Sequence, residues 1–283
     1  MNARSEPLFP ADAAIRRIGG ESALMLAAGR ALLMQVAHPL VAAGVADHSG
    51  FTEDPWRRLA RTMQAVYAVV FGTREEAERI RRGVAAAHAH VRGTLGERVG
   101  RFPAGTPYRA DDPALTLWVH ATLVDTALEV YTRFVGPIAD ADRAEFYEQM
   151  KAVADIFGVP RGVIPPGHQA FDVYVANMLQ SGELAAGSQA RAIAQTVLDP
   201  PVPLPLKPTF IAMAHVTAAL LPEPLPALYG LRAGRAERAL TRWSAAVSRR
   251  VVPRVPDPLR VVGPSGRRSR PGLALRVLDV MAR

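Results

Sequence analysis

Cysteine is absent from the 283 residues of this chain. Its absence excludes disulfides, thiolate zinc sites, iron–sulfur clusters and a cysteine nucleophile. Any metal must therefore be held by histidine, carboxylate or carbonyl ligands, and the chain has only seven histidines.

Several catalytic and nucleotide-binding motifs are also missing. The sequence contains no P-loop, no GxGxxG fingerprint and no GxSxG elbow, and Gly19-Gly20 lacks the preceding strand that a nucleotide loop needs. It has no HExxH, ExxH or paired-carboxylate spacing either. These absences argue against nucleotide binding, serine hydrolysis, zinc hydrolysis and a di-iron bundle.

No uninterrupted apolar run is long enough for a membrane span. The longest, residues 23–46, contains Arg30 and His38, and both side chains would be costly in lipid. Residues 1–17 carry charges of both signs without an apolar segment, unlike a signal peptide. We therefore expect residues 23–46 to form a buried helix of a soluble protein, and we expect a cytoplasmic location.

What the chain does have is a large apolar fraction and a positive charge. Residues of the hydrophobic class make up 49% of it, which is typical of a globular protein, and the formal net charge is +8. Such charge can attract nucleic acid or anionic membranes. The arginines are spread along the chain, except at Arg267-Arg268-Ser269-Arg270, and they fit a GC-rich coding bias equally well. A nucleic-acid-associated scaffold is therefore the least favoured hypothesis.

Helix boundaries are marked clearly in the sequence. Asp54-Pro55 and Asp112-Pro113 each combine an N-cap with a proline at the first helical position, and Thr73 to Glu76 has capping-box spacing. Strand-like alternation is essentially absent. Further helices fit residues 139–157, 171–180, 188–198, 208–221 and 236–250. The sequence therefore predicts an all-α fold, a single globular multi-helix domain with a wrapped C-terminal part.

Arg58, Arg61 and Thr62 lie three and four residues apart on one predicted helix. This spacing places them on one broad helical face. Charged faces are usually solvated, so the arginines could also pair with carboxylates such as Glu53 or face water. The spacing alone favours this simpler interpretation.

Histidines on three predicted helices are the remaining chemical candidates. His88 and His90 point about 200° apart on a helix, so they cannot chelate one metal together. His38 precedes Pro39, where a helix should end or kink, and His120 lies inside an apolar helix. Inward histidines could form a metal centre, and a neutral interior imidazole is what a haem iron requires. A lone histidine on an apolar face is more often part of the core.

The order of short motifs resembles the MpaB/latex-clearing-protein family, which contains the rubber-oxygenase catalytic domain. The motifs run as follows: Gln35-Val36-Ala37-His38-Pro39, His48-Ser49-Gly50-Phe51, Asp54-Pro55, Arg58-x-x-Arg61-Thr62, Phe71-Gly72, His88-x-x-Val91-Arg92-Gly93, and Asp112-Pro113 with Trp118-Val119-His120-Ala121. The resemblance covers residues 12–250 and leaves 251–283 as a basic C-terminal extension. It implies a globin-reminiscent helical core that binds haem b and uses dioxygen to cleave carbon–carbon double bonds.

The resemblance also assigns residues to the site. Rubber oxygenases carry an Arg-x-x-Lys-Thr pattern on the distal side of the haem and a later histidine as the proximal iron ligand. By position, Arg58 and Thr62 would be distal residues and His88 the ligand, although a small register shift would exchange His88 for His90. We expect His38, His48 and His120 to support the cofactor or the structure around it.

Arg61 departs from the family pattern, because rubber oxygenases have a lysine at this position. A guanidinium stays protonated and has no lone pair for iron. Arg61 would leave the sixth iron position open, or pair with a haem propionate or a carboxylate. Because of Arg61, the resemblance does not carry polyisoprene over to this chain as its substrate.

These observations lead to one hypothesis and one alternative. We expect a haem b-dependent oxygenase-like protein that acts with dioxygen on a hydrophobic, isoprenoid-like small molecule, with Arg58 and Thr62 orienting dioxygen by hydrogen bonding. The alternative is a non-enzymatic haem or lipophile carrier or sensor on the same fold.

Overall fold

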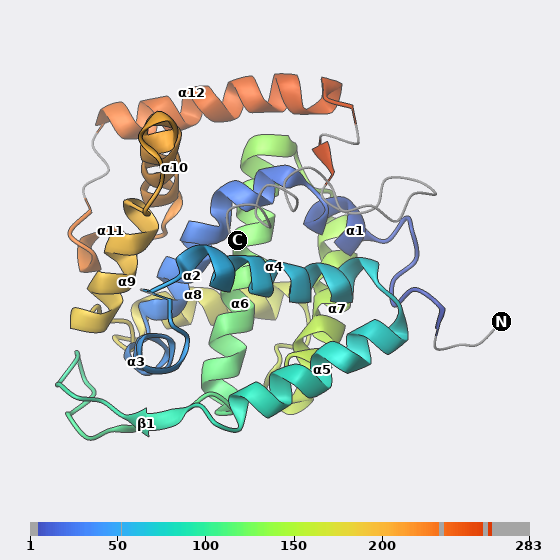
Figure 1. Cartoon of the computed structure of the whole chain (residues 1–283). Helices are drawn as coiled ribbons and strands as arrows, with labels where there is room; N and C mark the ends of the chain where they lie inside the picture. The colour runs from blue at the N-terminus through green and yellow to red at the C-terminus, as the bar shows by residue number, and fades with distance from the viewer. Residues whose placement is uncertain (1–4, 52, 232–234, 257–259, 262–283) are drawn as a thin grey trace.

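The structure, a computed structural model, describes residues 5–51, 53–231, 235–256 and 260–261 (Figure 1). Over these residues the predicted all-α fold is confirmed. The α-helices are α1 (Ala14–Gly19), α2 (Ala28–Val36), α3 (Pro39–His48), α4 (Pro55–Phe71), α5 (Arg74–His88), α6 (Pro113–Val130), α7 (Asp140–Ile156), α8 (His168–Gln180), α9 (Ser188–Leu198), α10 (Lys207–Leu220), α11 (Leu225–Leu228) and α12 (Arg235–Val251). The Arg-rich segment at 267–270 lies outside the described residues.

Helix α6 runs through the middle of the molecule, with other helices on both sides (Figure 1). It is apolar around most of its circumference, which is typical of a fully buried helix. Trp118 and Val124 have no exposed surface, and the Trp118 indole N–H donates to the Met34 carbonyl at 3.1 Å. As predicted, Asp112 caps its start, because a carboxylate oxygen accepts from the Ala114 N–H at 2.8 Å.

The expectation of one buried helix over residues 23–46 was wrong. This run forms a 3-10 helix at Ser22–Ala27, then α2, then α3. The break falls at His38-Pro39, because proline has no N–H for the helical ladder and pushes the residue before it into an extended conformation. The run is nevertheless largely buried, so it contributes two short core helices in place of one long one.

Helices α4 and α5 form an antiparallel pair joined by the turn at Gly72-Thr73. Both predicted starts are confirmed. Asp54 accepts from the Arg57 N–H at 2.9 Å, while Thr73 and Glu76 form the reciprocal capping box at 3.2 and 2.8 Å. The two helices meet at this turn and diverge toward the start of α4 and the end of α5 (Figure 1).

A small antiparallel hairpin, which the sequence did not predict, follows α5. Strand β1 (Arg92–Thr94) pairs with β2 (Pro107–Arg109), with Gly93 opposite Tyr108. A Cβ on Gly93 would lie 2.5 Å from the Tyr108 hydroxyl, so the glycine of the Val91-Arg92-Gly93 motif admits the tyrosine ring. The Tyr108 hydroxyl donates to Asp47 at 2.6 Å and thereby ties the hairpin to α3.

The remaining predicted helices are found as α7, α8, α9, α10 and α12, with α8 beginning three residues earlier than predicted. Among the described residues, no helix is both long and apolar enough to cross a bilayer. The division at residue 250 and the globin-like character of the core stay predictions.

Candidate functional site

A pocket opens between α2, α4, α9 and α10. Its empty volume, including the part open to solvent, is about 970 Å³. Its lining residues are Met25, Ala28, Gly29, Ala31, Leu32, Gln35, Phe51, Pro55, Trp56, Arg58, Leu59, Thr62, Met63, Leu123, Thr196, Val197, Pro200, Phe210, Met213, Ala214 and Thr217. The lining is therefore predominantly apolar, and it includes two of the sequence-predicted site residues.

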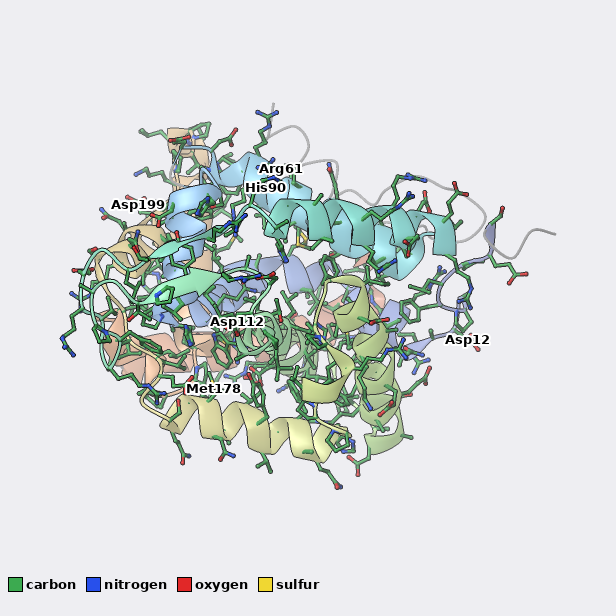
Figure 2. The ribbon with its side chains drawn as sticks, turned by 90° about the horizontal axis from the view of Figure 1, so that it is seen from below. Asp12, Arg61, His90, Asp112, Met178 and Asp199 are labelled. Atoms are coloured by element: carbon green, nitrogen blue, oxygen red, sulfur yellow. The ribbon has the colours of Figure 1, made fainter. Side chains whose placement is uncertain are left out.

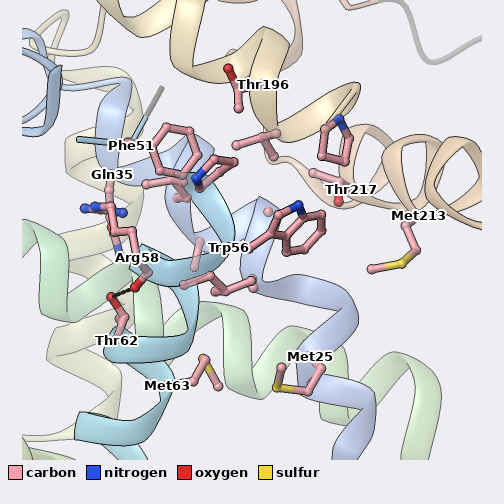
Figure 3. Close-up of a pocket in the computed structure, with 18 of the residues that line it drawn as sticks. Met25, Gln35, Phe51, Trp56, Arg58, Thr62, Met63, Thr196, Met213 and Thr217 are labelled. Atoms are coloured by element: carbon pink, nitrogen blue, oxygen red, sulfur yellow. Dashed lines mark hydrogen bonds between the residues drawn. The ribbon is translucent and has the colours of Figure 1, made fainter. Parts of the chain in front are cut away.

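The pocket has a polar side and an apolar side. Figure 3 shows Gln35, Arg58 and Thr62 gathered on one side, while Met25 and Met213 lie on the other. Such an arrangement suits a ligand that is largely hydrophobic but carries one polar end.

Arg58 is the charged residue among those that line the pocket. Its side chain is half-buried, and its guanidinium carbon lies 5.4 Å from the centroid of the Phe51 ring, in a cation–π contact. Burial lowers the pKa of Arg58, and the positive charge of Arg61 lowers it further. Within the described part of the chain, the guanidinium has no hydrogen bond or ion pair, so the expected alternative of a carboxylate partner such as Glu53 is not what the structure shows.

Thr62 lies one turn after Arg58 on α4 and also lines the pocket. Its hydroxyl donates to the Arg58 carbonyl at 3.0 Å. Because the donor is used within the helix, the hydroxyl oxygen is left as an acceptor. Thr62 therefore adds a weak polar group beside the cation.

Arg61 lies outside the pocket that Arg58 and Thr62 line. Like Thr62 it is exposed (Figure 2), but it is not among the lining residues. The helical spacing explains this, because Arg58 and Thr62 are four apart and share one face, whereas Arg61 lies to one side of it. The position at which the chain departs from the rubber-oxygenase pattern thus lies outside the pocket.

His88 and His90 occupy different environments at the end of α5. His88 is half-buried and has no hydrogen bond or ion pair with any described residue; burial lowers its pKa, an effect that the charge of Asp111 opposes. His90 is exposed, and its Nδ1 lies 2.9 Å from the Ala86 carbonyl oxygen (Figure 2). Of the two, His88 is therefore the more buried imidazole.

His88 does not line the pocket that contains Arg58 and Thr62. The reason is the divergence of α4 and α5, which places the start of one helix apart from the end of the other (Figure 1). The structure thus places Arg58 and Thr62 in one pocket and His88 outside it, at the end of the neighbouring helix α5.

His38 and His120 are buried and neutral. Burial lowers the pKa of each to about 4. His38 caps α3, since its Nδ1 accepts from the Leu40 N–H at 3.3 Å, and its Nε2 lies 3.8 Å from Glu183. His120 lies on α6, one turn before the pocket residue Leu123, and forms no hydrogen bond with the described residues. Neither histidine lines the pocket.

A multi-histidine metal centre is not found. In the part of the chain that the structure describes, no group of three or more histidine, aspartate or glutamate side chains is arranged to hold a metal ion. His48, the other candidate near α3, lies 3.2 Å from the Tyr108 hydroxyl through its Nε2. The histidines are instead spread over separate elements: His38 and His48 at the two ends of α3, His88 and His90 at the end of α5, His120 on α6, His168 on α8 and His215 on α10.

Sequence reasoning missed most of the pocket wall. Trp56, Phe210 and Met213 supply much of its aromatic and thioether surface. Trp56 packs edge-on against Phe210, with their ring centroids 5.3 Å apart. Trp56 directly follows the predicted Asp54-Pro55 start, but no signal in the sequence links α4 to α10.

Comparisons with known proteins agree with the motif order. Residues 15–250 match the family model described as the catalytic domain of ER-bound oxygenase mpaB/B′ and rubber oxygenase. An uncharacterised protein of Mycobacterium bovis and one of Mycobacterium tuberculosis are each 28% identical over 233 residues, which is 80% of this chain and 87% of the relative. No solved structure matches the chain. The match to the family model spans well over half of the sequence, and the chain belongs to the mpaB/B′ and rubber oxygenase catalytic-domain family.

Proposed function

We propose that this chain is a haem b-dependent oxygenase that acts with dioxygen on a hydrophobic small molecule, with isoprenoids as the first class to test. The observation that carries the proposal is the apolar pocket, in which Arg58 and Thr62 of the family motif are the polar groups on α4. Oxidative cleavage would use both atoms of dioxygen: one carbon–carbon double bond breaks, and each fragment gains one carbonyl oxygen, so no further reductant is needed.

The residues present are chemically compatible with haem. A histidine that serves as axial ligand must be neutral and have a free lone pair. His88 is half-buried, lacks a hydrogen-bond partner in the described structure and has a pKa lowered by burial. A single imidazole suffices for haem, unlike a non-haem iron site, which needs several protein ligands. His88 would hold the iron, and bound haem would supply dioxygen activation.

The protein's own contribution is positioning and exclusion of water. The methionine, leucine and aromatic side chains of the pocket would hold an apolar substrate. Arg58 is a permanent donor with five N–H groups, so it could orient dioxygen while also contacting the substrate. His38 and His120 would keep the helices around the site in place, through the cap on α3 and through the buried position on α6.

Titration of the purified full-length chain with haemin tests the cofactor. We expect uptake to stop at one haem per chain, with a Soret band that remains after gel filtration. A chain that takes up no haemin would contradict the haem-dependent oxygenase.

One observation favours a second candidate, a lipophile carrier or sensor on the same fold. No histidine is among the residues that line the pocket, and a carrier would need only this apolar cavity. The carrier would bind the same hydrophobic molecules but leave them and dioxygen unconsumed.

A further inference from the structure

We infer that the polar side of the pocket binds the carboxylate of an amphipathic ligand, an aliphatic or isoprenoid acid whose hydrocarbon tail occupies the apolar side. The inference names a substrate class for the pocket and therefore rests on the proposed function. It is carried by the environment of Arg58.

Two arginines, the buried Arg30 and the half-buried Arg58, have opposite surroundings. Arg30 is 3% exposed, and its guanidinium donates to Asp125, the Thr126 hydroxyl and the Leu220 carbonyl at 2.7, 2.6 and 2.8 Å. Arg58 contacts the Phe51 ring and has no such oxygen partner among the described residues. Among the described residues, the buried Arg30 is thus neutralised, whereas the half-buried Arg58 lies at the wall of a cavity without an opposite charge.

An unneutralised cation at an apolar wall favours an anionic ligand. Removing a guanidinium from water costs free energy that an opposite charge offsets. Burial lowers the pKa of Arg58, in agreement with this cost, and the nearby Arg61 adds a second positive charge. An anion bound at Arg58 would offset both the desolvation of the guanidinium and its repulsion by Arg61.

The shape of the pocket specifies the rest of the ligand. Gln35 and Arg58 lie together on one side, so an amide and a guanidinium can both donate to one carboxylate (Figure 3). The Thr62 hydroxyl lies beside them but donates to the Arg58 carbonyl. Met25, Met63 and Met213 line much of the remainder with flexible thioether chains, which adapt to irregular hydrocarbon shapes, and Thr196 and Thr217 add two hydroxyl side chains there. The lining thus has its charge at one end only, and so should the ligand.

The charge balance favours a carboxylate over a phosphate. The planar guanidinium matches a carboxylate with two parallel hydrogen bonds. Arg58 is the cation in the pocket lining and balances one negative charge, because the charge of Arg61 is exposed to solvent outside the pocket. A phosphate monoester or diphosphate would bring additional negative charge into a pocket whose described lining includes a single charged side chain. The excess charge would remain desolvated and unpaired.

Binding of cis-parinaric acid and of its methyl ester to the full-length chain, followed by the fluorescence of the probe, tests the inference. We expect the acid to bind at least about tenfold more tightly than the ester, as a charge-assisted pair would give. Arg58→Gln should lower the affinity for the acid to that of the ester and leave the ester unchanged, whereas Arg58→Lys should retain part of the preference.

Arg57→Gln is the matched control, because Arg57 is an exposed neighbour on the same helix and the substitution removes the same charge. It should keep the preference for the acid. Equal affinity for acid and ester, or an equal loss in both variants, would overturn the inference. Tighter binding of an alkyl phosphate of matched chain length would overturn the choice of a carboxylate.

Haemin-loaded protein separates this inference from the proposed function. We expect loaded protein to retain the preference for the acid; loss of that preference on loading would mean that a haem propionate occupies Arg58, and would overturn the inference while supporting haem binding. Protein that binds the acid selectively but takes up no haemin would support the inference and contradict the haem-dependent oxygenase.

Discussion

His88→Ala should abolish haem binding: the purified variant should lack a stable Soret band and retain almost no haem after gel filtration. The expected loss is nearly complete, because a single axial imidazole carries the iron–protein bond and no cysteine exists to replace it. Absorbance and haem content per chain measure the result, and far-ultraviolet circular dichroism should show unchanged helix content.

His90→Ala is the matched control for this prediction. His90 lies two residues away on the same segment but is exposed, with Nδ1 2.9 Å from the Ala86 carbonyl. The variant should keep its haem. Added imidazole should restore the Soret band of His88→Ala, because the free ring can enter the space vacated by the side chain. A Soret band that survives in His88→Ala but disappears in His90→Ala would show that the iron ligand is assigned to the wrong histidine.

Asp125→Ala should be among the most destabilising single substitutions in the helical core. The Arg30 side chain is 4% exposed, and among the described residues its charge is balanced by Asp125, 2.7 Å away. Removing the carboxylate leaves a buried cation with only neutral partners, and we expect the free energy of unfolding to fall by about 3 kcal/mol. Urea unfolding followed by circular dichroism measures the change.

The control is Asp142→Ala, because the Arg17–Asp142 pair lies at the surface, with side chains 44% and 45% exposed. Exposed ion pairs contribute little, so this variant should lose no more than about 1 kcal/mol. Asp125→Asn should fall between the two, because it keeps an acceptor without the charge. Equal losses for Asp125→Ala and Asp142→Ala would contradict the role assigned to the buried pair.

Helix starts were predictable because their causes are local. Asp54, Thr73 and Asp112 each satisfy backbone N–H groups within three residues, so a short stretch of sequence contains the whole interaction. The break at His38-Pro39 is equally local. Residues 23–46 were expected to form one helix because the run is predominantly apolar, but the proline ends the helix whatever the length of the run. The hairpin was missed because Gly93 meets Tyr108 across a long intervening loop.

The site was predictable only in part. Arg58 and Thr62 were found because four-residue spacing and the motif order both placed them on one face, and the pocket includes both. Arg61 was expected near them but is exposed. The opposite wall comes from Phe210 and Met213 on α10, which lie about 150 residues further along the chain. No local pattern encodes such a contact, since it depends on how the helices pack.

The positions of the buried histidines were predictable, but their roles were not. His38 before proline was expected at a helix boundary, and it caps α3. His120 was expected to face inward, and it is 5% exposed. The assignment of His38, His88 and His120 to haem binding stays a prediction, which haem titration of the variants tests.

Oxygen incorporation is the most direct test of an oxygenase. Haem-loaded protein is incubated with isotopically labelled dioxygen and an isoprenoid substrate, and the products are trapped by reduction before they exchange oxygen with water. We expect both cleavage fragments to carry label, and neither fragment to form with His88→Ala. Haem-loaded protein that binds the isoprenoid but leaves it and the labelled dioxygen unconsumed would contradict the oxygenase and identify the chain as a carrier.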